Sequence, residues 1–135
     1  MALQLSVAAR NAILDSIETT VGTAAVLKLR TGAPPADVAT ADSGTVVATM
    51  TLPSDWMSAA SSGSKALLGT WQDTSADNAG TVGHFRIYQS DGTTKHIQGT
   101  VTATGGGGDM TLDNNVLTAG QAVSITSFTL SAGNS

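Results

Sequence analysis

Residues 82–103, VGHFRIYQSDGTTKHIQGTVTA, decide the fold, because apolar and polar side chains alternate on both sides of a turn. Phe85 and Ile87 share one face of the first half. The second half places four small or apolar residues on one face: Ile97, Gly99, Val101 and Ala103. Alternation with a period of two is typical of half-buried strands, and the Asp-Gly pair at 91–92 is a hairpin turn signal. The stretch therefore predicts a β-hairpin.

The length of the hairpin loop sets which residues pair across the two strands. A two-residue loop would pair Phe85 with Gln98, which would bring an apolar row beside a polar one. A loop with an odd number of residues, such as 90–92, pairs Phe85 with Ile97 and keeps the two apolar rows together. We expect a type I turn followed by a G1 bulge, with Gly92 in the left-handed region.

The opposite face of this hairpin is polar. In the odd-loop register His84, Arg86 and Tyr88 share it, and His96 lies near Arg86. Two histidines would need a third ligand and supporting hydrogen bonds to hold a metal ion, and the sequence indicates neither. We therefore expect solvated or interfacial histidines on this face.

Short strands with turn signals between them fill the rest of the chain after residue 22. Period-two alternation or short apolar runs predict strands at 25–30, 45–52, 66–71, 110–112, 116–118 and 122–130. The last strand changes phase, so we expect a bulge near Thr126-Ser127; the alternative is a central strand packed on both sides. Seven or eight short strands predict a mainly β protein, an antiparallel β-sandwich or jelly roll, over residues 23–135.

The N-terminal arm, residues 1–22, contains the one predicted helix. Ser6 is a good N-cap, and Gly22 suits the left-handed position after the last turn, so we expect a helix over 6–21. An apolar stripe runs along one face of this helix and consists of Ala9, Ile13, Leu14, Ile17 and Val21. The other faces carry Arg10, Asn11, Asp15 and Glu18. The stripe either anchors the chain to a partner or covers an open end of the β domain.

Composition narrows the classes of function. The 135 residues include no cysteine, only 12% are charged, and the net charge is −4. Six Lys and Arg residues do not make a nucleic-acid footprint, and cysteine-based metal sites and disulfides are excluded. The start of the chain lacks the pattern of a signal peptide, and no apolar stretch approaches the length of a membrane span, so we expect neither.

Three further motifs resemble chemical sites only in part. Residues 73–78 look like the start of a calcium loop but lack its Gly and terminal Glu. Residues 62–65 match Ser-x-x-Lys within a serine-rich tract that predicts a surface loop, so Lys65 is expected to be solvated. The glycines at 105–108 predict a flexible or tightly curved connection. We expect no catalytic, cofactor-binding or metal-binding residues and no enzymatic activity.

Aromatic and apolar side chains outside the predicted core indicate a binding surface instead. Trp71 ends an apolar strand and is expected in the core, whereas Trp56 lies in a loop and Tyr88 on the polar hairpin face. Tryptophan and tyrosine are enriched in protein interfaces, and flat aromatic rings also bind sugars. The expected interface residues are Leu5, Ile13, Ile17, Trp56, Met57, Arg86, Tyr88 and His96.

The turn and strand motifs together resemble a known family. They are Leu29-Arg30-Thr31-Gly32-Ala33-Pro34-Pro35, Gly80-Thr81-Val82-Gly83-His84-Phe85-Arg86-Ile87, Asp91-Gly92-Thr93, Gln98-Gly99-Thr100-Val101 and Gly107-Gly108-Asp109-Met110. With the size and low charge of the chain, they resemble small virion structural proteins of tailed bacteriophages, most like capsid decoration (cement) proteins with jelly-roll folds.

The resemblance implies a structural role on the outside of a phage head, assembled in the host cytoplasm. Its partners would be the major capsid protein and further copies of this chain, as a dimer or trimer, without nucleic acid or membrane. One alternative is a tail or fibre module that adsorbs to a host-surface glycan through Tyr88 and Trp56. A third is a small hydrolase that depends on His84.

Overall fold

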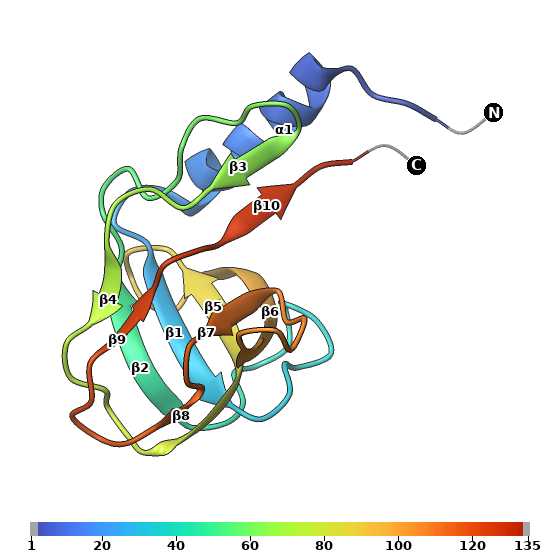
Figure 1. Ribbon diagram of the computed structural model, residues 1–135. Coiled ribbons are helices and arrows are strands. Elements are labelled where there is room, and N and C mark those ends of the chain that lie inside the picture. The colour runs from blue at the N-terminus through green and yellow to red at the C-terminus, as the bar shows by residue number, and fades with distance from the viewer. Residues whose placement is uncertain (1–2, 134–135) are drawn as a thin grey trace.

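The computed structural model describes residues 3–133, with one helix and ten short strands in that range (Figure 1). Met1 and Ala2, part of the predicted N-terminal arm, lie outside the described residues. The elements are α1 (Val7–Val21), β1 (Val26–Thr31), β2 (Val46–Thr51), β3 (Ser64–Ala66), β4 (Trp71–Asp73), β5 (Gly80–Tyr88), β6 (Lys95–Ala103), β7 (Met110–Leu112), β8 (Val116–Leu117), β9 (Val123–Ile125) and β10 (Thr129–Ser131).

The main sheet has the strand order β2-β1-β5-β6-β7, and β8 pairs with the start of β5. The pairs are antiparallel except β6 with β7, which is parallel. The separate β4-β9 pair contacts β2 through β4 and β7 through β9, so the sheet curls on itself. This curled, partly parallel sheet confirms the mainly β class but not the predicted jelly roll.

The parallel pair depends on the glycine run between β6 and β7. A parallel connection normally needs a dozen or more residues, but here the chain returns from Ala103 to Met110 in a tight loop. Gly105 and Gly107 have φ angles of 89° and 81°, which favour glycine. A Cβ on Gly106 would lie 2.7 Å from the Thr102 side chain. Of the two predicted forms of this loop, the tightly curved one is confirmed.

The predicted hairpin exists, but its register differs by two residues. Phe85 pairs with Gly99 and Ile87 pairs with Ile97, so the two apolar rows stay together as expected. The predicted pairing of Phe85 with Ile97 is wrong. A Cβ on Gly99 would lie 2.7 Å from the Phe85 ring, so the absence of a side chain at Gly99 makes room for the ring.

The loop of this hairpin explains the shift. The Gln89 amide donates to the Thr94 carbonyl at 2.8 Å, which closes a loop of four residues, 90–93. An even loop alone would bring apolar rows beside polar rows. A register shift between Ile87 and Tyr88 corrects this mismatch, so the irregularity lies in the strand rather than in the loop. Gly92 has a φ of 71°, in the left-handed region as predicted.

Two predicted strands are each divided in two. The stretch 66–71 becomes the end of β3 and the start of β4, and 122–130 becomes β9 and most of β10. β4 pairs with β9 in the body, whereas β3 pairs with β10 in an outer unit that also contains α1 (Figure 1). The phase change in 122–130 marks the crossing between the two units, and no continuous strand with a bulge is formed there.

Aromatic rings join the body and the outer unit. Trp56 and Trp71 lie 5.9 Å apart between ring centroids, and Phe128 lies 5.7 Å from Trp71 and 5.5 Å from Phe85. Trp71 is fully buried, as predicted. Trp56 lies in a loop, as predicted, but it is fully buried and its indole N–H donates to the Gly22 carbonyl, so its expected place outside the core is wrong.

Candidate functional site

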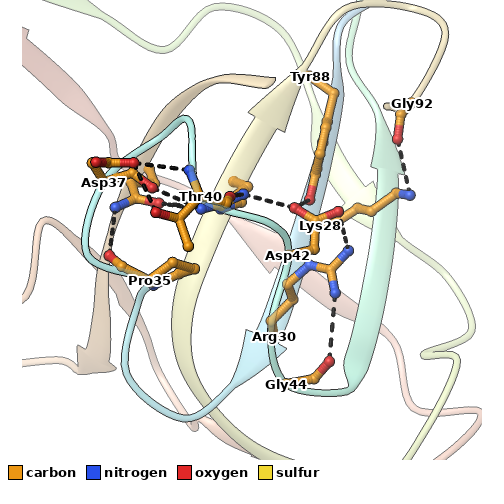
Figure 2. Close-up of polar contacts among 11 residues, drawn as sticks. Lys28, Arg30, Pro35, Asp37, Thr40, Asp42, Gly44, Tyr88 and Gly92 are labelled. Atoms are coloured by element: carbon orange, nitrogen blue, oxygen red, sulfur yellow. Dashed lines mark hydrogen bonds and ion pairs between the residues drawn. The ribbon is translucent and has the colours of Figure 1, made fainter. Parts of the chain in front are cut away.

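Segment 32–44 covers the polar face of the central strands β1, β5 and β6, and Figure 2 shows the contacts that hold it there. The sequence predicts this face to be solvated or interfacial. In the structure His84, Arg86 and Tyr88 are all fully buried, so the predicted exposure is wrong. The physical reason is that a loop distant in sequence provides hydrogen-bond acceptors for side chains that would otherwise need water.

Arg86 is the centre of this contact, and its guanidinium uses all five N–H groups. Nε and Nη2 donate to the Gln98 side chain at 3.1 and 2.8 Å. Nη1 donates to the Thr40 carbonyl and to the Asp42 carboxylate, both at 2.8 Å, and Nη2 donates to the Asp37 carbonyl at 3.0 Å. A buried cation is tolerated when it is paired and fully hydrogen-bonded, so these contacts explain why Arg86 is inside.

Asp42 is the carboxylate that joins the segment to the sheet (Figure 2). It accepts from Arg86 at 2.8 Å, from Arg30 at 3.1 Å and from the Tyr88 hydroxyl at 3.0 Å. Burial acts to raise the pKa of Asp42, but the bonds from Tyr88 and Arg86 and the charge of Arg30 together hold it below its usual value. One carboxylate therefore serves two arginines.

His84 lies next to these arginines and is incompletely bonded. Its Nδ1 lies 2.9 Å from the Gly32 carbonyl, whereas its Nε2 is buried with no hydrogen-bond partner among the described residues. Burial lowers the pKa of His84, and the charges of Arg30 and Arg86 lower it further, against the opposing bond to Gly32. The ring is thus held neutral beside two cations.

A further buried cation, Lys65, joins α1 to β3. Its ammonium donates to Asp15 and to the Ser58 carbonyl and pairs with Glu18, each at 2.8 Å. The side chain is 3% exposed, so the predicted solvation of Lys65 is wrong. Burial acts to lower the pKa of Lys65, but the bonds to the two carboxylates raise it. This ammonium therefore stays protonated at neutral pH, and only a neutral amine can act as a base.

An open cleft of about 500 Å³ lies beside this ion cluster, between α1 and the segment before Trp56. Its lining includes Asp15, Glu18, Asp55 and Lys65. Across residues 3–133 no group of three or more histidine and carboxylate side chains is placed to hold a metal ion. In residues 73–78, which resemble only the start of a calcium loop, Asp73 and Asp77 accept hydrogen bonds from Thr49 on β2.

The eight expected interface residues fall into three groups. Trp56, Met57, Arg86 and Tyr88 are buried inside the chain, so their side chains are not on the surface where a partner would contact them. Ile17 and His96 are half-buried. The His96 ring lies 3.0 Å from the Gln89 side chain. The exposed members are Leu5 and Ile13.

Sequence reasoning missed two exposed apolar residues near Leu5. Leu3 is 80% exposed and Val7 is 47% exposed, while Ile13 is 46% exposed. The alternation of Leu3, Leu5 and Val7 with polar residues just before the helix was the signal that could have found them. We call Leu3, Leu5, Val7 and Ile13 the exposed arm residues.

The helical stripe is also rotated from its predicted position. Leu14 and Val21 are buried, but Ile13 is exposed and the side chains of Asn11, Asp15 and Glu18 face the β3 region instead. The predicted division into an apolar inner face and polar outer faces is therefore wrong at these four positions, which lie in both halves of α1. Backbone N–H groups of the β3 region need acceptors, and these polar side chains provide them.

Comparison with protein-family models, curated proteins and solved structures found no match to this chain. The described part of the chain contains no helix with both the length and the apolar character needed to span a bilayer.

Proposed function

We propose that this chain is a structural protein that binds copies of itself and a larger protein surface. The specific form of the proposal is a decoration protein that bridges major capsid proteins on the outside of a phage head. The resemblance of its turn and strand motifs to small phage virion proteins supports this form. A low content of charged residues also limits repulsion between closely packed copies.

The exposed arm residues are the observation that carries the proposal. Of the six large hydrophobic side chains exposed in the described residues, four belong to residues 3–13. The others, Leu68 and Val116, lie apart from this segment in the sequence. Full burial of an exposed side chain of this size contributes about 1.5–3 kcal/mol. Leu5, Val7 and Ile13 are already partly buried, so each can contribute roughly half of that, and part of it is offset by the cost of association. A concentration of apolar side chains at one end of the chain is typical of an interaction surface.

The arm divides into two halves with different roles. The second half of α1 covers the core with Leu14 and Val21. The first half, with the segment before it, extends away from the body (Figure 1). The helical stripe is expected either to anchor the chain to a partner or to cover an open end of the β domain. Each of these roles is thus supported for one half of the arm. On a capsid with many repeated sites, modest affinity per contact is sufficient because multivalent attachment raises the effective concentration.

The structure removes the support for the two other functions. The glycan-binding alternative needs exposed rings at Trp56 and Tyr88, and both side chains are fully buried. The hydrolase alternative needs an accessible His84, and this ring is buried beneath segment 32–44. No other observation favours either function.

The test replaces apolar arm side chains and counts bound copies. The triple variant Leu5→Gln, Val7→Gln, Ile13→Gln is mixed with heads assembled from the major capsid protein encoded in the same genome. We expect occupancy per head, measured by cryo-EM and quantitative gels, to fall at least about tenfold, because lost apolar burial of about 1.4 kcal/mol is already tenfold in affinity.

The matched control is Leu68→Gln with Val116→Gln, which removes equally exposed apolar side chains elsewhere. The control should bind as the wild type does. Circular dichroism tests whether each variant is folded. If the triple variant does not fold, the single variant Ile13→Gln is used in its place. Wild-type occupancy by the arm variant, or failure of the wild-type chain to bind heads, would refute the proposal.

A further inference from the structure

We propose that segment 32–44 is an acid-released latch, in which protonation of His84 at Nε2 detaches the segment and uncovers the sheet face beneath it. The latch does not depend on the proposed assembly role. It rests on the bonding of His84, on the charges that surround it, and on the close packing of Gly32 against the strand that carries His84.

The bonding of the histidine ring fixes which nitrogen can gain a proton. A carbonyl oxygen only accepts, so the 2.9 Å contact with Gly32 requires the proton to be on Nδ1. Nε2 then carries the lone pair, and it is buried without a partner among the described residues. Protonation would create a buried N–H donor with no acceptor, which is costly in a closed site. The closed latch therefore favours the neutral ring.

The charged groups around His84 act in the same direction. Arg30 faces it from the paired strand β1, and Arg86 lies on the same face of its own strand β5. The opposite residue on β6 is Thr100, which is neutral. Segment 32–44 contributes the carboxylate of Asp42, which already serves both arginines. A third cation would exceed the negative charge at this site.

The other carboxylate of the segment does not compensate for this charge. Asp37 accepts from the amide and hydroxyl of Thr40 within its own turn, and only its backbone carbonyl reaches Arg86. Burial and the neighbouring arginines keep the pKa of His84 below its ordinary value of 6.5. Protonation near pH 6 therefore requires the ring to reach water, which it can do when the segment moves away.

The sign of the pH effect follows from this difference. The closed form holds His84 neutral, so it binds fewer protons than the open form. Its stability relative to the open form is complete above pH 6.5 and falls as the pH drops below that value. Asp42 remains charged through this range because its pKa lies below 3.8. The opening is thus assigned to His84 rather than to loss of the Asp42 ion pairs.

The approach of the segment to the sheet also depends on Gly83. A Cβ at this position would lie 2.3 Å from the Gly32 carbonyl oxygen, a backbone atom that a side chain cannot displace cheaply. Replacement by alanine therefore separates Gly32 from β5 without any change in charge. It provides a variant that mimics the open latch at neutral pH.

The experiment is an NMR titration of the full chain from pH 7.5 to pH 5. It follows the His84 ring, solvent exchange of the Arg86 Nη–H groups that donate to the segment, and the Trp56 indole N–H as a reporter of the intact core. We expect Arg86 protection, corrected for the intrinsic pH dependence of exchange, to fall up to about tenfold per pH unit below 6.5. This slope is the limit for uptake of one proton. The Trp56 signal should stay unchanged.

Variants separate the latch from other causes. His84→Gln should keep Arg86 protected across the range, whereas His96→Gln, which replaces the half-buried histidine outside this cluster, should leave the transition in place. Gly83→Ala should lose protection already at pH 7.5.

Three results would overturn the latch: a transition that persists in His84→Gln, loss of the Trp56 signal at the same pH as Arg86 protection, or titration of His84 without opening. If His84→Gln does not fold, the wild-type titration decides by itself, because it compares His84 protonation and opening in the same sample.

Discussion

Arg86 is fully buried, although its strand pattern indicates a polar face open to water. The alternation of β5 assigns it to a polar face, and that assignment is confirmed by its register. Its burial comes from acceptors on segment 32–44 and β6, which provide partners for every N–H of the guanidinium. A planar group with five fixed donors suits this set of acceptors, and lysine, with three donors at one point, does not.

We predict that Arg86→Lys lowers the free energy of unfolding by about 2–4 kcal/mol, because acceptors that the guanidinium satisfies are left buried and unpaired. Urea denaturation followed by tryptophan fluorescence measures the change. Lys95→Arg, the converse exchange on the neighbouring strand, is the control and should alter stability by less than about 0.5 kcal/mol. If both exchanges lowered the free energy of unfolding equally, the five hydrogen bonds of Arg86 would not be the source of its contribution to stability.

At the scale of elements, α1 is attached partly through its polar side. Asn11 and Asp15 accept from the amides of Gly63 and Ala60, and Lys65 is enclosed by Asp15 and Glu18. The helix thus satisfies backbone groups of the short β3 region that the two-stranded β3-β10 pair leaves without partners. The helix and this pair stabilise each other, since neither is long enough to be stable alone.

We predict that Lys65→Met loosens α1 while the main sheet stays folded, because the two carboxylates lose their buried partner. Hydrogen exchange of α1 amides, measured by mass spectrometry, should become at least about tenfold faster, the equivalent of about 1.4 kcal/mol in local opening. Lys28→Met, which removes a lysine that donates to Gly92 on the far side of the sheet, should leave α1 unchanged. Unaltered exchange in the Lys65 variant would contradict this account.

At the scale of the whole molecule, Phe128 couples the outer unit to the body. It lies between β9 and β10, and its ring contacts both Trp71 and Phe85. With 4% exposure it is a core residue at the point where the chain passes from one unit to the other. This packing favours a single cooperative unfolding transition.

We predict that Phe128→Ala destabilises the protein by about 3–5 kcal/mol, the usual cost of removing a large buried ring. It should also separate the tryptophan fluorescence transition from the far-ultraviolet circular dichroism transition, because the two units lose their shared contact. Leu68→Ala, at a 41% exposed position next to Leu67, whose amide donates to the Phe128 carbonyl, should keep one transition and nearly wild-type stability. Coincident transitions in Phe128→Ala would show that other contacts couple the units.

The sequence by itself determined the features that depend on near neighbours. It placed the helix between Ser6 and Gly22, located the hairpin, and kept its two apolar rows together, because caps, turns and period-two alternation act over a few residues. It also assigned Trp71 to the core. The register error of two residues shows the limit of such reasoning, since an even loop and a strand irregularity produce the same facing of apolar rows as an odd loop.

Only the tertiary structure decided which polar surfaces are covered. Segment 32–44 buries Arg86, and α1 buries Lys65. After β9 the chain continues into β10, which pairs with β3. Each of these depends on groups far apart in the chain that satisfy one another's hydrogen bonds and charges. The physical reason is that alternation specifies which side chains share a face, while burial of that face depends on whatever distant segment provides its partners.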